Sequence, residues 1–163
     1  ANTSSLYWFR DIINDQCSEL DIRGYAHRGF VACVNDFNSY YRANIDLLNY
    51  HKAMEVFNDD WPIYTRTNDS CPTQYAADVN VKNSLVSNGC LIEGNLENSV
   101  IGRGAVIKKG AVVKNSVILP AAYIGEDVHI ENVVVDKKAR IVRKKELIGS
   151  EEHPLYVKRN DKI

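Results

Sequence analysis

Residues 101–141 read IGRGAVIKKGAVVKNSVILPAAYIGEDVHIENVVVDKKARI and place an aliphatic residue at every fifth or sixth position. From Ile101 these positions are Ile107, Val113, Ile118, Ile124, Ile130, Val135 and Ile141, with steps of 6, 6, 5, 6, 6, 5 and 6 residues. One full cycle therefore takes 17 residues, and Asn98, Asn115 and Asn132 recur independently in the same register. A fixed period of this kind indicates an array of stacked structural units.

A small residue stands two positions before most of these aliphatic residues, as Ala105, Ala111 and Ser116 do. Residues two apart in a strand point to the same side, so each short strand sends one small and one branched side chain inward. The repeat therefore predicts a mainly β protein with a triangular parallel β-helix of about four coils. Each coil has three short strands.

The outward positions between the inward pairs sort into three faces. One is entirely apolar and consists of Leu85, Val100, Val117 and Val134. The second holds Val106, Tyr123 and Arg140, and the third includes Leu91, Val112 and His129. We predict that the apolar face is an interface, because a contiguous apolar stripe usually packs against a partner surface. The alternative is that valine stands on exposed strands for its β preference alone.

The remainder of the chain differs in composition from the repeat. Of its 15 aromatic residues, 14 lie outside residues 79–142, which hold 20 of the 31 Val and Ile. We predict an α/β segment at 1–57 with a helix, two strands at Ile22–His27 and Phe30–Val34, and a second helix capped by Asp36. A connector then spans 58–76, the β-helix 77–142, and a basic C-terminal tail 143–163.

Overall charge and cysteine usage narrow the function classes. Lys plus Arg number 20 and Asp plus Glu 21, so the net charge of −1 gives no electrostatic case for nucleic acid or an anionic membrane. No run is apolar and long enough to be a membrane helix. The four cysteines, Cys17, Cys33, Cys71 and Cys90, lack zinc-site spacing. We expect them to be reduced, in a cytoplasmic protein.

The repeat resembles the left-handed β-helix of hexapeptide proteins, which include acyltransferases, γ-class carbonic anhydrases and sugar-nucleotide pyrophosphorylases. The flanking runs Ser39–Leu48 (SYYRANIDLL) and Pro62–Arg66 (PIYTR) resemble the C-terminal part of glucose-1-phosphate adenylyltransferase. That family makes ADP-glucose and pyrophosphate from ATP and glucose 1-phosphate for glycogen synthesis. The resemblance implies that the chain is a fragment in which residues 1–57 are the C-terminal remnant of the nucleotidyltransferase domain. It also implies that the fragment lacks the active site, with no catalytic or metal-binding residues and no cofactor of its own. Mg²⁺ and ATP are expected for the parent enzyme complex.

The segment Gly29–Asp36 (GFVACVND) aligns with the last sugar-site motif of that family but departs from it. Val31 replaces a tryptophan, Cys33 a metal-binding aspartate and Asn35 a glycine. A thiol is a poor ligand for Mg²⁺. The chain thus resembles the GlgD-type regulatory subunit, which implies a catalytic subunit as partner in a homo- or hetero-oligomer. The apolar residues Val31, Ala32 and Val34 beside Cys33 in the sequence predict that this cysteine is a buried structural thiol.

Basic residues gather where the repeat ends, and they include Arg140, Arg143, Lys144, Lys145 and Arg159. The resemblance implies that they bind a phosphorylated sugar effector, and arginine can hold phosphate through two donors. The alternative is an ordinary solvated surface.

A second functional hypothesis is a stand-alone hexapeptide acyltransferase that uses acetyl-CoA, with His129 as general base. A carbonic anhydrase would need a three-histidine metal site, whereas His27, His51, His129 and His153 are spread along the chain.

Overall fold

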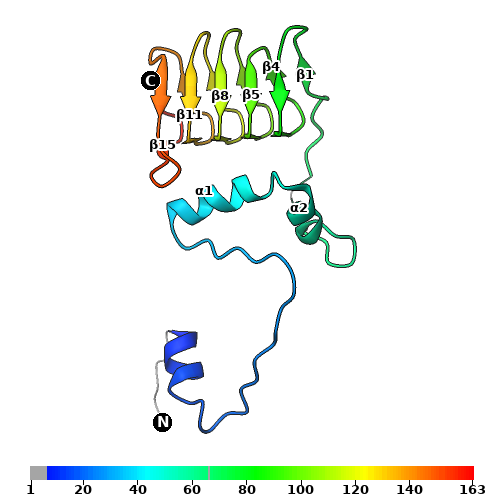
Figure 1. Cartoon of the computed structure of the whole chain (residues 1–163), viewed down its shortest axis with the longest axis vertical. Helices are drawn as coiled ribbons and strands as arrows, with labels where there is room; N and C mark the ends of the chain where they lie inside the picture. The colour runs from blue at the N-terminus through cyan, green and yellow to red at the C-terminus, as the bar shows by residue number, and fades with distance from the viewer. Residues whose placement is uncertain (1–6, 66) are drawn as a thin grey trace.

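The protein is described here from a computed structural model, which covers residues 7–65 and 67–163. Its C-terminal half is a triangular parallel β-solenoid, and the N-terminal part is a chain with three short helical elements that approaches one side of it (Figure 1). The triangular β-helix predicted from the repeat is therefore confirmed.

Three sheets of five strands form the solenoid, and every pairing within them is parallel. Sheet A contains β1 (Gln74–Tyr75), β4 (Leu91–Ile92), β7 (Val106–Ile107), β10 (Tyr123–Ile124) and β13 (Arg140–Ile141). Sheet B contains β2 (Val81–Lys82), β5 (Asn95–Glu97), β8 (Val112–Lys114), β11 (His129–Glu131) and β14 (Glu146–Ile148). Sheet C contains β3 (Leu85–Val86), β6 (Val100–Ile101), β9 (Val117–Ile118), β12 (Val133–Val135) and β15 (Leu155–Val157). The chain makes four turns between β1 and β13.

The core is a column of aliphatic side chains along the solenoid axis. Ile92, Ile107, Ile124 and Ile141 are stacked in register in sheet A and are fully buried. The small residues of the repeat, among them Ala105 and Ala139, are equally buried. The interior is narrow, so two large residues from one strand would overfill it, and alternation of branched with small residues fits the space.

Corners between strands require backbone conformations that few residues adopt. Asn83, Asn98, Asn115 and Asn132 take the corner between sheets B and C with φ between 41° and 52°. Asparagine tolerates this left-handed region better than most residues with a side chain. Inside the same corner, the hydroxyls of Ser84, Ser99 and Ser116 accept hydrogen bonds from the backbone N–H of the next coil at 3.1–3.2 Å.

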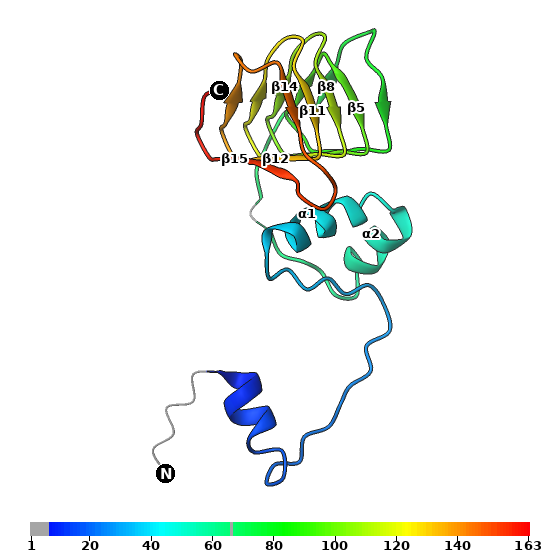
Figure 2. The same cartoon turned by 60° about the vertical axis from the view of Figure 1, so that its left-hand side comes forward.

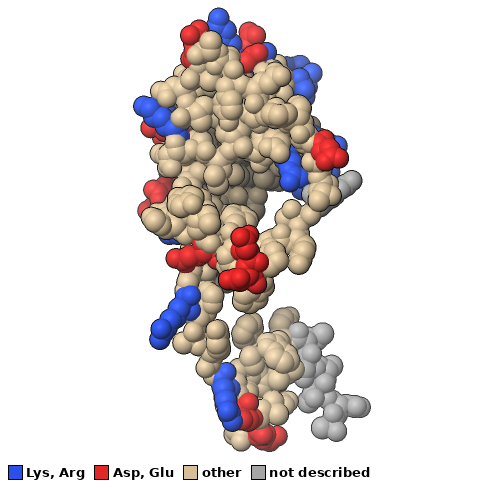
Figure 3. Space-filling view, turned by 90° about the vertical axis from the view of Figure 1, so that its right-hand side faces the viewer, with Lys and Arg blue, Asp and Glu red and all other residues tan. Residues whose placement is uncertain are grey.

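The ends of the solenoid are finished differently. At the last coil, residues 161–163 pair with β13, since the N–H of Arg140 donates to the carbonyl of Asp161 at 2.7 Å and that of Val142 to Ile163. The tail crosses this end in Figure 2. At the first coil, the face seen in Figure 3 shows mainly uncharged side chains at its centre, with charges toward the rim.

The N-terminal part has less regular structure than the sequence predicts. Trp8–Asn14 forms a short π-helix, η1, and the helices α1 (Phe37–Asp46) and α2 (Tyr50–Val56) follow. The two strands expected at Ile22–His27 and Phe30–Val34 do not form, and both segments are extended without a sheet partner among the described residues. A strand needs a neighbouring strand to satisfy its backbone, and none of the described strands lies beside these segments.

None of the helices within residues 7–65 and 67–163 has the length and apolar character needed to cross a bilayer.

Gly102 tests the close approach of successive coils. A Cβ at this position would lie 2.7 Å from the backbone nitrogen of Pro120 and 3.0 Å from the carbonyl oxygen of Ile118, both of the next coil. We predict that Gly102→Ala lowers the free energy of unfolding by about 1–3 kcal/mol, as overpacking does, when urea unfolding is followed by circular dichroism. Gly24→Ala is the matched control, because no atom lies within 4 Å of its Cβ position. Equal stability of the two variants would contradict this packing.

Candidate functional site

The predicted apolar face is covered by a helix of the same chain. Val117 and Val134 are completely buried, and they pack with Val100 against Tyr40, Tyr41 and Ile45 of α1. Leu85, the fourth predicted member, lies at the first coil and stays 43% exposed. Tyr156 of β15 extends the row beside Val134, and its ring meets Phe37 of α1 edge-on at 5.6 Å.

The outward faces of sheets A and B match the faces predicted from the sequence except for one residue, Leu91. Leu91 pairs with Val106 in sheet A, so it belongs to the face of Tyr123 and Arg140, whereas His129 pairs with Val112 and Glu146 in sheet B. One coil is shorter than the others in sheet A: Leu91 and Val106 are 15 residues apart, whereas Gln74 and Leu91, like Val106 and Tyr123, are 17 apart. The 17-residue register does not hold across this coil, and the placement of Leu91 with Val112 and His129 is wrong.

Helix α1 is held at its N-terminal end as well as along its buried side. Asp36 caps it as predicted, with its carboxylate accepting from the N–H of Ser39 at 2.7 Å. The amide of Asn38 donates to the carbonyl of Glu152, in the loop before β15, at 2.8 Å. Ten helical residues span about 15 Å, close to three coil spacings of about 4.8 Å each. The helix therefore runs along the stacking direction and contacts several coils at once (Figure 1).

Tyr41 joins the helix to the corner between sheets B and C. Its side chain is buried, and its hydroxyl donates to the carbonyl of Asn115 at 2.6 Å and lies 3.2 Å from Oδ1 of Asn132. Burial, with smaller contributions from Glu151 and Glu131, raises the pKa of Tyr41 to about 12. The tyrosine thus serves as a neutral hydrogen-bond donor that connects two successive coils.

The asparagines at this corner form a ladder of amides. Nδ2 of Asn83 donates to Oδ1 of Asn98 at 2.8 Å, and Nδ2 of Asn98 donates to Oδ1 of Asn115 at 3.2 Å. Asn132 continues the column and donates to the carbonyl of Gly149 at 3.1 Å. The repeat thus produces a regular array of amide groups on the outside of the solenoid.

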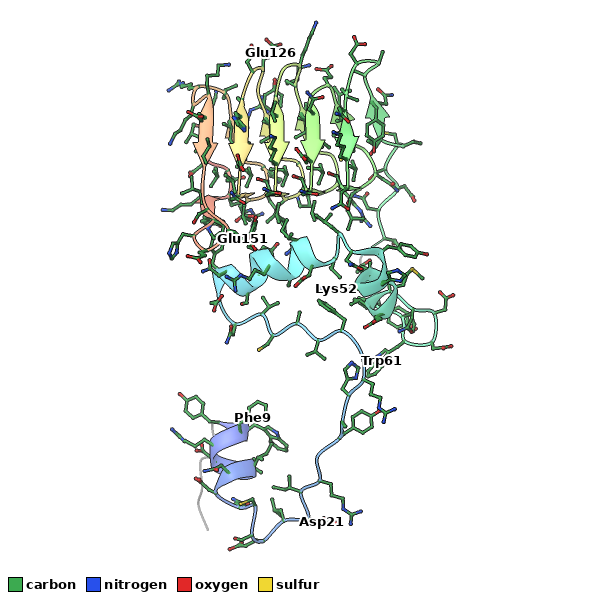
Figure 4. The ribbon with its side chains drawn as sticks, viewed as in Figure 1. Phe9, Asp21, Lys52, Trp61, Glu126 and Glu151 are labelled. Carbon is green, nitrogen blue, oxygen red and sulfur yellow. The ribbon has the colours of Figure 1, made fainter. Side chains whose placement is uncertain are left out.

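A groove of about 860 Å³ lies between this ladder and the two helices, and we call it the ladder groove. It is lined by Tyr41, Arg42, Ile45, Asp46, Leu48, Asn49, Lys52, Asn83, Asn98, Asn115, Asn132 and Glu151. Its volume falls in the range of small-molecule sites. Lys52 and Glu151 lie toward opposite ends of α1 (Figure 4). Lys52 is paired with Asp46, so the lining carries two cationic and two anionic side chains in total.

The predicted basic residues are all exposed and lie around the last coil. Arg140 is on β13, with its guanidinium 4.1 Å from the ring centroid of Tyr123. Arg143, Lys144 and Lys145 follow β13 at the corner before β14, and Lys145 donates to the carbonyl of Glu126 at 2.5 Å. Arg159 follows β15 at the next corner, near Asp136. They therefore flank sheet A from two corners and do not converge on one pocket that the structure describes.

His129 and Cys33 have surroundings that bear on the enzyme hypotheses. Nε2 of His129 is buried without a hydrogen-bond partner, and Oε2 of Glu131 lies 3.9 Å away. Cys33 is exposed, so the prediction of a buried thiol is wrong: its apolar sequence neighbours Val31 and Val34 are themselves exposed and do not cover it. A single exposed thiol does not suit Mg²⁺. In the described ranges, no group of three or more His, Cys, Asp or Glu side chains is placed to hold a metal ion.

The ladder groove was not predicted from the sequence. The Asn register was visible as a repeat, but Arg42, Lys52 and Glu151 carry no pattern that links them to it. They meet the asparagines only because α1 lies on sheet C.

Val117 tests whether the contact with α1 depends on an apolar surface. We predict that Val117→Lys releases α1 and lowers stability by about 3 kcal/mol or more, because a buried lysine has no partner there. Limited proteolysis should then cut within residues 37–56. Val106→Lys is the control, as Val106 faces outward on sheet A, away from the helix. The same protease resistance in both variants would contradict the helix contact.

The raised pKa of Tyr41 makes the free energy of unfolding fall with pH in the alkaline range. The folded chain keeps the tyrosine proton up to a pKa of about 12, whereas an unfolded tyrosine loses it near pH 10. Stability from this group is therefore complete below about pH 10 and falls as pH rises toward 12. Tyr41→Phe should cost about 1 kcal/mol at pH 7 through the lost hydrogen bond and should make the alkaline decline shallower.

Urea unfolding at pH 7, 9, 10 and 11 measures both effects. Tyr64→Phe is the control, because its ring is 92% exposed. An alkaline slope that is identical for Tyr41→Phe and the unmodified chain would contradict a buried, hydrogen-bonded phenol.

Known proteins similar to this chain agree with the resemblance inferred from its motifs. It is 35% identical over 150 residues to the glycogen biosynthesis protein GlgD of Bacillus subtilis (strain 168). The aligned region covers 92% of this chain and 44% of that protein. It is 36% identical over 115 residues to the glucose-1-phosphate adenylyltransferases of Bacillus thuringiensis (strain Al Hakam) and Bacillus cereus (strain Q1), over 70% of this chain and 30% of each.

The chain thus spans less than half the length of these relatives. Their similarity does not favour the acetyl-CoA acyltransferase hypothesis. The model of a family described as GlmU-like, C-terminal hexapeptide matches residues 71–154, just over half of the 163 residues. The repeat, the solenoid and these similarities together place the chain in the GlmU-like C-terminal hexapeptide family.

Proposed function

We propose that this chain is the C-terminal assembly and regulatory region of a GlgD-type subunit of glucose-1-phosphate adenylyltransferase, active in glycogen biosynthesis. The intact subunit modulates the conversion of ATP and glucose 1-phosphate to ADP-glucose and pyrophosphate by a catalytic partner subunit. The similarity to GlgD over 92% of the chain supports this role. Catalysis, with its Mg²⁺ and ATP, belongs to the enzyme complex and not to the residues described here.

The seating of α1 on sheet C is the structural observation that carries the proposal. The helix contacts the solenoid through apolar residues, through the Tyr41 hydroxyl and through Asn38, and the segment before it leads away from the solenoid (Figure 1). A change at the solenoid can therefore be transmitted as a rigid displacement of α1. This gives an allosteric region a physical connection to whatever domain it regulates.

Exposed apolar side chains before the solenoid support an assembly role. Tyr25, Val31, Trp61 and Tyr64 are 90%, 70%, 79% and 92% exposed, and they lie in segments with little regular structure. Large exposed apolar groups of this kind mark surfaces that pack against protein. The nucleotidyltransferase domain of the parent is the surface we propose for them.

The test of the proposal is ADP-glucose synthesis by the full-length parent, alone and mixed with its catalytic partner. We expect little activity alone and a changed rate or effector response in the mixture. A parent that neither acts nor changes the partner's kinetics, despite co-purifying with it, would overturn the regulatory role. A parent fully active alone would overturn it as well.

Arg143 and Lys144 test the proposed binding of a phosphorylated sugar. We predict that the double variant Arg143→Ala, Lys144→Ala shifts the half-saturating effector concentration of the complex upward about tenfold, equivalent to roughly 1.4 kcal/mol of lost binding. Lys109→Ala is the control, an exposed lysine at the corresponding corner two coils earlier. An unaltered activation curve would assign the basic residues to ordinary surface.

A further inference from the structure

From the ladder groove we infer that this protein binds a neutral, linear oligosaccharide along the Asn83–Asn132 ladder. The class we name is an α-glucan chain, and that choice rests on the proposed role in glycogen biosynthesis. The broader class, a neutral linear oligosaccharide, follows from the polarity, charge and repeat of the groove and does not depend on that role.

Spare hydrogen-bonding capacity is the first argument. Each asparagine amide has two N–H groups and an oxygen with two lone pairs. The bonds within the ladder use one N–H of Asn83 and of Asn98 and one lone pair of Asn98 and of Asn115. Each rung therefore retains donors and acceptors beside the groove. Sugar hydroxyls, which donate and accept at once, match such amides.

Charge is the second argument. Arg42 and Lys52 are balanced by Asp46 and Glu151, and Lys52 is already paired with Asp46. A sugar phosphate or nucleotide needs an excess of cationic donors, which this lining lacks. Neutral polyols carry no such requirement.

Repetition is the third argument. The rungs recur at the coil spacing of about 4.8 Å, and Ile45 and Leu48 on the opposite wall offer apolar contact to the C–H faces of a sugar. A single small ligand would use one or two rungs, whereas a chain of similar units can bond to successive rungs. The array therefore suits a linear chain of sugars.

The test is calorimetric titration of the full-length protein with maltoheptaose. The groove variant is Asn83→Gly with Asn98→Gly, which removes two amides and keeps a residue that accepts positive φ. Asn160→Gly is the matched control, since Asn160 also has positive φ (62°) but lies at another corner outside the groove. We expect saturable binding, about tenfold weaker in the groove variant and unchanged in the control.

A second variant covers the case in which the double glycine variant fails to fold. Arg42→Ala removes guanidinium donors from the helix wall at an exposed position and should weaken binding severalfold. Absence of saturable binding to the full-length protein, or equal affinity in folded groove and control variants, would overturn the inference. Displacement of maltoheptaose by glucose 1-phosphate at equal concentration would overturn it too, in favour of an anion site.

ADP-glucose synthesis measured with the same preparations separates the two proposals. Loss of glucan binding with intact modulation of the catalytic partner refutes the groove assignment alone. Glucan binding without modulation refutes the regulatory role alone.

Discussion

The corner between sheets B and C is the constraint on which the rest of the structure depends. The chain turns there within one or two residues at the first four of its five corners, and it does so with φ between 41° and 52° at four asparagines. This geometry sets the register of the sheets, because each corner residue fixes where the next strand begins. Serine hydroxyls stabilise the inner side of the same corner by binding the next coil. One repeated position thus determines both the stacking inside the solenoid and the amide array outside it.

Helix α1 converts this repeated corner into a specific site. The valines of sheet C provide an apolar strip for the helix, and the hydroxyl of Tyr41 is bonded to the backbone of one corner asparagine and lies near the amide of the next. The helix covers the strip but leaves the amide column open on one side, and the ladder groove is the space that remains. The contact between α1 and sheet C therefore both attaches the helix to the solenoid and forms one wall of the ladder groove.

The solenoid could be predicted from sequence because its signals are local and repeated. Inward aliphatic residues recur every five or six positions, and the αL asparagines recur with them. The apolar row on sheet C was predictable for the same reason, although what covers it was not. Tyr41 and Asn115 are separated by 74 positions in the chain, and no periodicity connects them.

The errors have equally specific causes. The prediction for Leu91 is wrong at the one coil, from β4 to β7, that is two residues shorter than its neighbours in sheet A, because the 17-residue register does not hold there. The segments 22–27 and 30–34 have strand-like residues but no partner strand in the described structure, and local preference alone does not make a sheet. Cys33 is exposed there for the same reason, since burial depends on a covering layer that its sequence neighbours cannot supply.

Native-state hydrogen exchange of α1 tests the central claim, that this helix is an integral part of the solenoid, most directly. If it is, the amides of residues 41–46 open with free energies close to those of β9 and β12, because α1 and sheet C separate only when the solenoid itself unfolds. Exchange of these amides at the rate of the extended segment 22–34, with β9 and β12 still protected, would show a loosely held helix and contradict the account.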